Sequence, residues 1–259
     1  RLNPEQVKLY LASAPQRKAD LSNLALPPRS TLGRLAKSPA LREAAIAPYK
    51  VYCPESLLVR GFSADILQKY EIGYDMVTAK AVLPLRDVKQ RLVGLTYRVD
   101  YDWLPEEAKY WHDHFDKTAH VYGLSQWMGK SVGDFWATEG NLDPVRLYQL
   151  DTAGGAVMGT VISPAQLRLI RGIRFTRFVL GLDNDRAGKA GTRRAIHQLV
   201  NEGFGKRLVV PVFPDGVKDP GELRSKIGVT YLPWLEWLEA NPPPPPSEQP
   251  KKRLEWTLK

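Results

Sequence analysis

The chain of 259 residues is long enough for one large domain or two modest ones, and its 43% hydrophobic content excludes wholesale disorder. Its formal net charge of +9 favours a polyanionic partner, with nucleic acid expected first and an anionic membrane second, while a solvated basic surface is the plain alternative. The single cysteine, Cys53, excludes an internal disulfide and a cysteine-based zinc ribbon within this sequence, and suits a reducing compartment such as the cytoplasm; no run of about 18 apolar residues is present to span a membrane.

The first half of the chain mixes helical and strand patterns. Residues 1–50 carry nine Lys/Arg against three Asp/Glu, with short helical patterns near 3–14 and 39–47, and we interpret them as a basic helical linker or appendage. Residues 54–70 are predicted to be helical with a break at 60–63, where Ser63 is the expected N-cap of the second helix. Residues 81–86 and 92–98 predict a pair of antiparallel strands, and residues 100–133 are predicted to be mostly loop.

From Asp134 onward, strand and helix patterns alternate. Strands are predicted at 135–138, 156–158, 178–182 and 208–213, and helices at 144–150, 164–170, 187–202 and 220–227, with Ser163 capping the second of these helices. Alternation at this spacing predicts a parallel sheet covered by helices. Trp234, Leu235 and Leu238 could dock a last helix, and five prolines at 242–246 then predict a stiff, extended spacer.

Acidic residues follow three of the predicted strands. Glu139 follows the first strand, with Asp143 four residues further; Asp183 and Asp185 follow the third; and Asp219 lies beyond the fourth. Because ligands of an open parallel sheet bind outside the carboxyl ends of its strands, we expect these carboxylates to converge at one edge. Two residues at i and i+2 of an extended segment point the same way, and paired carboxylates suit Mg²⁺ with phosphate oxygens. The pattern predicts a metal site for phosphoryl transfer, although each acidic motif alone is more often a solvated loop or a helix cap.

Two motifs resemble the TOPRIM domain that is shared by DnaG-type primases, type IA and type II topoisomerases and certain nucleases. These are Thr138-Glu139-Gly140-Asn141-Leu142-Asp143 and Gly181-Leu182-Asp183-Asn184-Asp185-Arg186-Ala187-Gly188. The resemblance implies that Glu139, Asp183 and Asp185 are catalytic and that Asp143 and Asp219 join them in holding Mg²⁺ or Mn²⁺. The segment Val217-Lys218-Asp219-Pro220 is similar to the third family motif. Primases often carry a further Asp two residues on, where this chain has Gly221.

The segment before the TOPRIM motifs is similar to the N-terminal part of the DnaG-type primase core. Arg60-Gly61-Phe62-Ser63, Pro84-Leu85-Arg86-Asp87, Lys109-Tyr110 and Val121-Tyr122-Gly123-Leu124 carry this resemblance. It implies a groove for single-stranded template and nucleoside triphosphates lined by Arg86, Arg98, Lys109 and Lys117. The compact form looks like a phage or mobile-element version.

The expected architecture is therefore α/β, with a TOPRIM parallel sheet flanked by helices and preceded by a smaller mixed α+β subdomain. We divide it into a linker (1–50), a primase-core subdomain with the basic groove (51–133), a TOPRIM catalytic domain (134–228) and a C-terminal helix with a proline-rich tail (229–259). The expected function is synthesis of RNA primers on single-stranded DNA in a bacterial cytoplasm, with a helicase or zinc-ribbon module supplied in trans or by a further segment. A metal-dependent nuclease and a non-catalytic DNA-binding module of a replisome are the alternatives.

Overall fold

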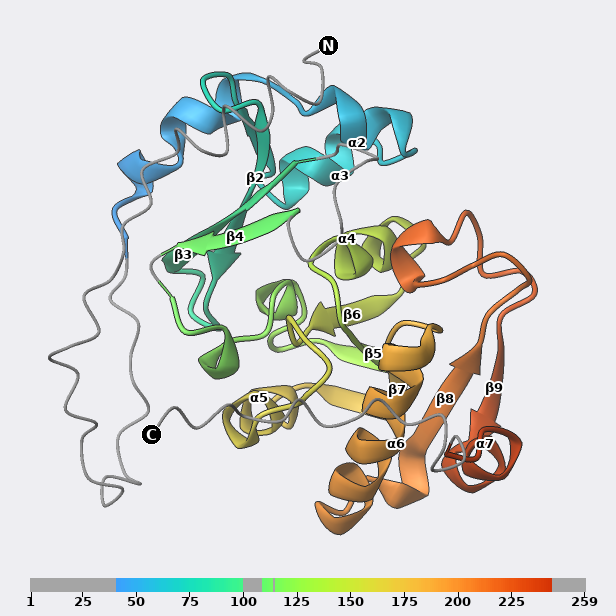
Figure 1. Cartoon of the computed structure of the whole chain (residues 1–259). Coiled ribbons are helices and arrows are strands. Elements are labelled where there is room, and N and C mark those ends of the chain that lie inside the picture. Colours follow the sequence, from blue (N-terminus) through green and yellow to red (C-terminus); the bar gives the residue numbers. More distant parts are fainter. Residues whose placement is uncertain (1–40, 100–108, 114, 244–259) are drawn as a thin grey trace, which may run out of the picture. The chain divides into compact units, whose positions relative to one another are not determined.

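The structure is a computed structural model that describes residues 41–99, 109–113 and 115–243. Two sheets organise this part of the chain, one formed before residue 114 and one after residue 130 (Figure 1). Most of the basic linker expected over residues 1–50, and the proline-rich tail from residue 244 onward, lie outside the described residues.

The first sheet is antiparallel, with the strand order β1-β2-β3-β4. Its two long central strands confirm the predicted pair. The short edge strands were not predicted, and the fourth corrects the expectation of loop over residues 100–133. Three or four residues are too few for alternation to be visible in a sequence. The strands are β1 (Gly73–Asp75), β2 (Lys80–Arg86), β3 (Leu92–Arg98) and β4 (Tyr110–Asp113).

Two short helices, α2 (Glu55–Val59) and α3 (Ala64–Lys69), precede the first sheet. The break between them is confirmed: the Ser63 side chain accepts a hydrogen bond of 3.3 Å from the backbone N–H of Ile66 and so caps α3. One buried cluster joins these helices, the first sheet and the first helix of the second half, since Leu57, Leu83 and Val145 all belong to it. A continuous apolar core therefore fixes the first sheet relative to the second.

The second sheet has the order β6-β5-β7-β8-β9. Its first four strands are parallel, which confirms the prediction, while the last is an antiparallel edge strand that was not predicted. The strands are β5 (Ser131–Thr138), β6 (Ala153–Ala156), β7 (Arg174–Gly181), β8 (Leu208–Val212) and β9 (Thr230–Pro233).

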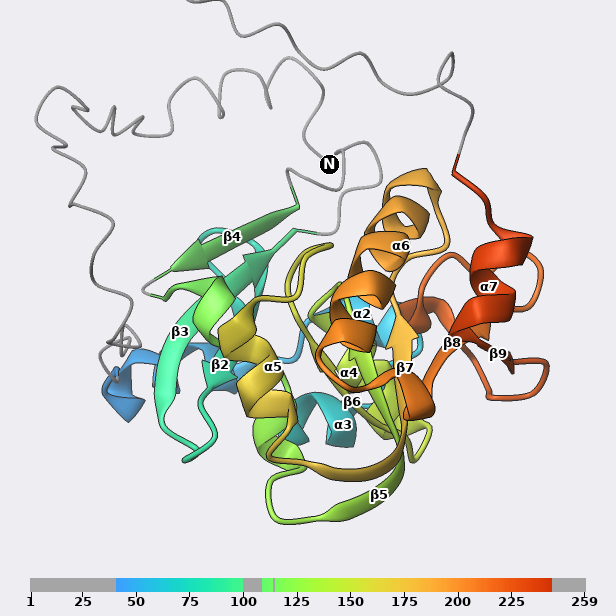
Figure 2. The same cartoon turned by 90° about the horizontal axis from the view of Figure 1, so that it is seen from below.

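Helices cover both faces of this sheet because the side chains of its strands alternate in direction. Phe135 of β5 and Phe178 of β7 face the helices α5 (Pro164–Ile170) and α6 (Arg186–Asn201). Trp136, the next residue of β5, points to the other face and packs with Leu147 of α4 (Leu142–Gln149). Figure 2 shows α5 and α6 on one side of the sheet, with α4 beyond it. The connections β5-α4-β6, β6-α5-β7 and β7-α6-β8 therefore bring every loop after a parallel strand to one edge.

Two predicted boundaries are wrong. β6 ends at Ala156 instead of beginning there, because two glycines that indicate a loop in the sequence lie inside the strand and leave room for Leu147 and Val121. The helix predicted over residues 220–227 is only a 3-10 turn, η8 (Pro220–Glu222). The possible last helix is confirmed as α7 (Trp234–Ala240). No helix among the described residues has both the length and the apolar character needed to cross a bilayer.

Candidate active site

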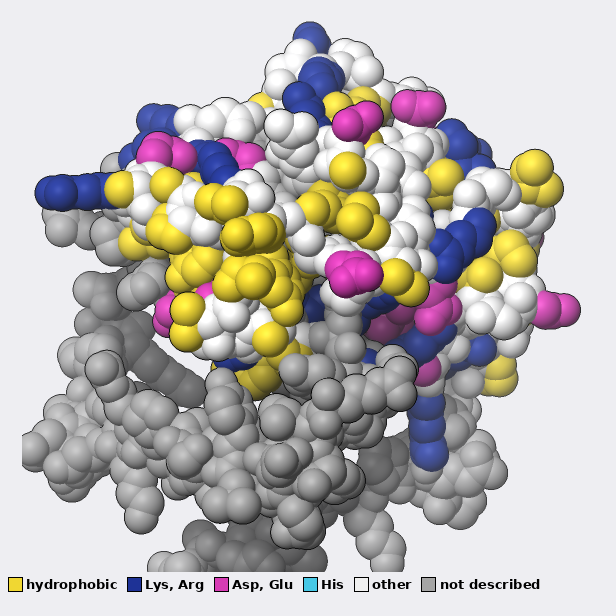
Figure 3. Space-filling model, turned by 90° about the horizontal axis from the view of Figure 1, so that it is seen from above, with side chains coloured by type: hydrophobic (Ala, Val, Ile, Leu, Met, Phe, Trp, Pro, Cys, Tyr) yellow, Lys and Arg dark blue, Asp and Glu magenta, His cyan; other side chains and the backbone are white. Residues whose placement is uncertain are grey.

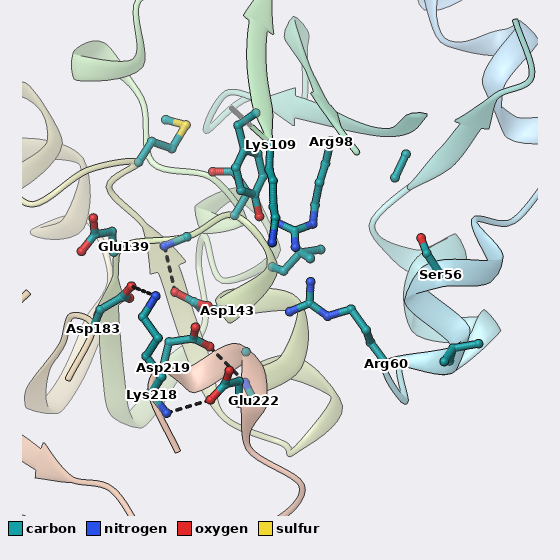
Figure 4. Close-up of a pocket in the computed structure, with 18 of the residues that line it drawn as sticks. Ser56, Arg60, Arg98, Lys109, Glu139, Asp143, Asp183, Lys218, Asp219 and Glu222 are labelled. Atoms are coloured by element: carbon teal, nitrogen blue, oxygen red, sulfur yellow. Dashed lines mark hydrogen bonds and ion pairs between the residues drawn. The ribbon is translucent and has the colours of Figure 1, made fainter. Parts of the chain in front are cut away.

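Acidic side chains from three loops of the second sheet gather at its carboxyl edge. Glu139 is the first residue after β5, Asp183 is the second residue after β7, and Asp219 lies in the loop after β8. Burial raises the pKa of Glu139, and the charges of Asp185 and Asp219 add to the shift. Burial likewise raises the pKa of Asp183 to about 7, with further contributions from Glu139 and Asp219. Loops separated by about 40 residues in the sequence thus place their carboxylates within electrostatic reach of one another (Figure 4).

Asp143 is the most deeply buried member of this cluster, at 4% exposed. It belongs to the first turn of α4, and its Oδ2 accepts a hydrogen bond of 2.8 Å from the backbone N–H of Gly140. Burial, followed by the charges of Asp219 and Asp183, raises its pKa well above the ordinary range. Its neighbour across the loop is Gly221, where a Cβ would lie 2.9 Å from Oδ1 of Asp143 and 3.0 Å from Oδ1 of Asp219. A side chain at position 221 would therefore displace one of these two carboxylates.

Asp185 and Asp219 also cap helical turns. Oδ1 of Asp185 accepts from the backbone N–H of Gly188 at 2.8 Å, and Oδ1 of Asp219 accepts from the backbone N–H of Glu222 at 3.1 Å. Gly188 is required here for space, because a Cβ at this position would lie 2.0 Å from the carbonyl oxygen of Asp183. The caps fix both carboxylates to the rigid first turns of α6 and η8.

Lys218 lies among the acids. Its Nζ is 3.9 Å from Oδ2 of Asp183 and 3.8 Å from Oδ2 of Asp185, and its backbone carbonyl accepts a hydrogen bond of 2.7 Å from the N–H of Asn184. The loops after β7 and β8 are thereby held together by a backbone hydrogen bond and by the charge of Lys218. This charge lowers the pKa of Asp183, but burial and the neighbouring acids raise it more strongly.

The donor set of this cluster suits magnesium. Five carboxylates converge, and the raised pKa values of four of them show that their negative charges are poorly compensated by the protein alone. Within residues 41–99, 109–113 and 115–243, no three Asp, Glu, His or Cys side chains lie close enough together to hold a metal ion by themselves. Mg²⁺ is usually bound by only one or two protein carboxylates, together with waters and phosphate oxygens, so carboxylates of this chemistry suit it. Glu139, Asp143, Asp183, Asp185 and Asp219 are the residues available to hold it.

A groove of about 1690 Å³ runs from the acid cluster to the first sheet. Three of the four predicted phosphate-binding residues, Arg98, Lys109 and Lys117, line it. Arg98 is only 5% exposed, and its guanidinium lies over the ring of Tyr110 with 4.8 Å to the centroid. Acidic and basic side chains meet in a recess of the face shown in Figure 3. The groove is thus acidic on one side and cationic on the other, as binding of a metal-bound polyphosphate requires.

Arg60 is a fourth groove cation that the sequence analysis did not include among the site residues. It ends α2 and points toward the acids beside Arg98 and Lys109 (Figure 4), and its charge lowers the pKa of Asp219 against the stronger effect of burial. The signal that could have found it is the helix break at 60–63, which places an arginine at the end of a helix.

Arg86, by contrast, does not line the groove. Its guanidinium donates to Glu43 at 2.8 and 2.9 Å, to Glu71 at 2.8 Å and to the carbonyl oxygen of Gln90 at 2.8 Å. These contacts tie the end of β2 to η2 (Glu43–Ala45) and to the end of α3. The structure therefore does not bring Arg86 together with the other three predicted cations, because its hydrogen-bonding capacity serves an ion-pair network.

The unpredicted strand β4 completes the groove wall. Tyr110 and His112 alternate with Trp111 along it, so both rings face the groove while Trp111 lies on the opposite face near Lys80. Nδ1 of His112 is 3.0 Å from Oγ1 of Thr96, to which the amide of Asn141 donates at 3.2 Å. A polar chain thus connects the cationic wall to the loop that carries Glu139.

Comparison with known proteins agrees with this architecture. A family model described as Toprim-like matches residues 136–223. The DNA primase of Clostridium acetobutylicum is 31% identical over 170 residues, which cover 63% of this chain and 27% of that protein. The RNA polymerase domain of the Mycobacterium tuberculosis primase DnaG is similar in structure with a TM-score of 0.57 and 21% identity, over 70% of this chain and 76% of that domain. A DnaG primase catalytic domain bound to single-stranded DNA gives a TM-score of 0.59 and 22% identity. The similarity covers 76% of this chain and 75% of that domain.

Residues 136–223 are thus similar to the Toprim-like family, and this similarity covers the part of the chain that carries the acid cluster. Together with the subdomain before it, this part has the fold of the DnaG-type primase catalytic core, so the resemblance found in the sequence motifs is confirmed. The chain spans about a quarter of the length of the curated primases it matches.

Proposed function

We propose that this chain is the catalytic core of a DNA primase, which synthesises short RNA primers on single-stranded DNA by metal-assisted nucleotidyl transfer. The observation that carries the proposal is the groove in which a buried acid cluster faces Arg60, Arg98, Lys109 and Lys117. The sequence relationship to a DNA primase, and the fold shared with a DnaG catalytic domain whose structure contains single-stranded DNA, support it.

In this mechanism the protein supplies position and charge. A 3′-hydroxyl attacks the α-phosphorus of a nucleoside triphosphate, the new P–O bond forms as the bond to the β-phosphate oxygen breaks, and pyrophosphate leaves. Mg²⁺ or Mn²⁺, when bound, would make the hydroxyl more acidic and neutralise the pyrophosphate. Glu139, Asp183 and Asp185 would hold the cation as the principal ligands, with Asp143 and Asp219 completing the set. Because backbone N–H groups hold Asp143, Asp185 and Asp219 in place, little reorganisation of these three carboxylates is needed at the moment of reaction.

The cationic wall would bind the substrates. Arginine grips phosphate oxygens with a planar fork and lysine adds a mobile point charge, so Arg60 and Arg98 suit the triphosphate while the exposed Lys117 suits the template backbone. Tyr110, beneath Arg98, holds that guanidinium in place. A replicative helicase or zinc-ribbon module, and action in the bacterial cytoplasm, belong to the same proposal.

Incubation with single-stranded DNA, ribonucleotides and Mg²⁺ tests this function. We expect oligoribonucleotides whose sequence complements the template, and a loss of at least about a hundredfold in Glu139→Gln and in Asp183→Asn, since each substitution removes a charged oxygen ligand. Gly133→Ala is the matched control, because a Cβ at that position would have no neighbour within 4 Å. Metal-dependent degradation of the DNA without nucleotides would indicate a nuclease instead, and DNA binding unaffected by both acid variants, without synthesis, would indicate a non-catalytic module.

A further inference from the structure

Helix α4 carries a second functional group one turn after Asp143. Arg146 is only 2% exposed, and its guanidinium lies 4.0 Å from the ring centroid of Phe62. It donates hydrogen bonds to three backbone carbonyls. Nη1 donates to Gly61 at 2.7 Å, Nη2 to Arg60 at 2.8 Å and Nε to Gly221 at 3.2 Å. A single buried side chain thus contacts three backbone positions.

These carbonyls belong to two neighbouring segments that both contribute to the lining of the groove. Arg60 and Gly61 form the bend between α2 and α3, from which the Arg60 side chain points into the groove, whereas Gly221 lies in η8, two residues after Asp219. By binding both segments, the guanidinium of Arg146 sets the position of Arg60, a groove cation, relative to Asp219, an acid of the cluster.

An uncharged side chain could fill the space that the Arg146 side chain occupies. Arg146 packs on Phe62, which belongs to an apolar cluster with Leu142 and Val145 of the same helix, so an unbranched apolar side chain could pack there. Burying a guanidinium is costly compared with such a residue. The bend also has other donors, since Gln149 donates to the carbonyl of Gly61 at 2.9 Å and Arg224 donates to that of Arg60. An apolar substitution would leave only the link to Gly221 without its donor, so the fold should survive.

We propose that Arg146 is a positioning residue for substrate binding, which holds Arg60 in register with the acid cluster so that both engage one metal-bound triphosphate. This inference rests on the proposed function. It assigns no contact with substrate to Arg146: the effect passes through Arg60 on one side and through the Gly221 turn on the other. A brace that only stabilised the fold would have no specific connection with Arg60.

A double-mutant cycle distinguishes the two roles. The affinity for a fluorescent ATP analogue with Mg²⁺ is measured by equilibrium binding in the wild type, Arg146→Met, Arg60→Ala and the double variant. We expect each single variant to bind about tenfold more weakly, and the double variant no more weakly than Arg60→Ala alone, because Arg146 acts through a group that is already absent. In primer synthesis by Arg146→Met, we expect KM for the nucleotide to rise about tenfold while kcat changes by less than about threefold.

Arg171→Met is the matched control. Arg171 also lies over a phenylalanine, 5.3 Å from the centroid of Phe204, and donates to a backbone carbonyl, that of Glu202, at 2.6 Å, but it precedes β7 and therefore lies at the opposite edge of the sheet. Its substitution should leave nucleotide affinity unchanged. If Arg146→Met does not fold, Arg146→Lys retains the buried cation without the planar fork and should show the same loss.

Wild-type affinity in the Arg146 variant, or losses that multiply in the double variant, would overturn the inference. Failure of the proposed function is recognised separately, because nucleotide binding and its coupling do not require primer synthesis. A wild-type protein that binds the analogue with the expected coupling but makes no primer would refute the function and leave the positioning role standing. A wild-type protein that binds no nucleotide would refute both.

Discussion

Neutralising Asp183 should stabilise the metal-free protein at neutral and alkaline pH. Its side chain is about 20% exposed, and its pKa is raised from 3.8 to about 7, first by burial and then by Glu139 and Asp219. Between about pH 4 and pH 7 the folded state holds a proton that the unfolded state has already lost, so the free energy of unfolding falls as pH rises through this window. Three pH units at about 1.4 kcal/mol each give at most about 4 kcal/mol, which Asp183→Asn would recover.

Urea denaturation in EDTA at pH 5, 6, 7 and 8 measures this effect. The wild type should lose stability steadily from pH 5 to pH 7, and Asp183→Asn should follow a flatter curve, with the two proteins closest at pH 5 and furthest apart at pH 8. Adding Mg²⁺ at pH 8 should stabilise the wild type and do little for the variant, since only the folded wild type offers the complete ligand set. Asp134→Asn is a control, because that carboxylate pairs with Arg177 outside the cluster. Parallel pH curves for wild type and Asp183→Asn would refute the reasoning.

Three further outcomes are expected. Gly221→Ala should reduce primer synthesis at least about tenfold, because its Cβ would meet two cluster carboxylates at 3.0 Å or less, while Gly133→Ala in the same assay should retain activity. Lys117→Ala should weaken binding of single-stranded DNA for all sequences alike. In fluorescence anisotropy, the slope of log affinity against log salt concentration should fall in magnitude by about 0.7. An unchanged slope would show that Lys117 does not contact the DNA. Gln166→Leu should lower the free energy of unfolding, measured by urea denaturation, by about 2–4 kcal/mol. The reason is that the buried amide caps α5 and donates to the carbonyls of residues 117, 120 and 157. A loss below about 0.5 kcal/mol would contradict this.

The acid cluster was predictable because the rule behind it is topological. Once strands and helices alternate, the carboxyl ends of parallel strands must share an edge, so Glu139, Asp183 and Asp219 could be expected to meet without knowledge of any distance. The helix cap at Ser163 was likewise predictable, since it depends on residues three positions apart: its hydroxyl and the side chain of Gln166 form a complete capping box.

The cationic wall was less accessible from the sequence because it depends on contacts between distant segments. Arg86 and Arg98 stand in equally β-rich strands, yet one is bound by Glu43 and Glu71 and the other lies over Tyr110 in the groove. No feature of the neighbouring sequence distinguishes Arg86 from Arg98. The role inferred for Arg146 is still further from the sequence, since a charged residue on a helix usually lies in solvent and only the packing of α4 against the α2–α3 bend buries it.

The roles of the individual carboxylates, the domain boundaries and the identity of the metal remain predictions. Burial and the charges of Asp219 and Asp183 raise the pKa of Asp143, and clustered carboxylates with raised pKa values are typical of functional sites.

The most direct measurement of the central claim is anomalous diffraction from a crystal of the protein soaked in Mn²⁺. We predict at least one manganese peak at the carboxyl edge of the second sheet, in contact with oxygens of Glu139 and Asp183 and absent in Glu139→Gln crystals. Full manganese occupancy elsewhere on the protein, with none at this edge, would contradict the claim.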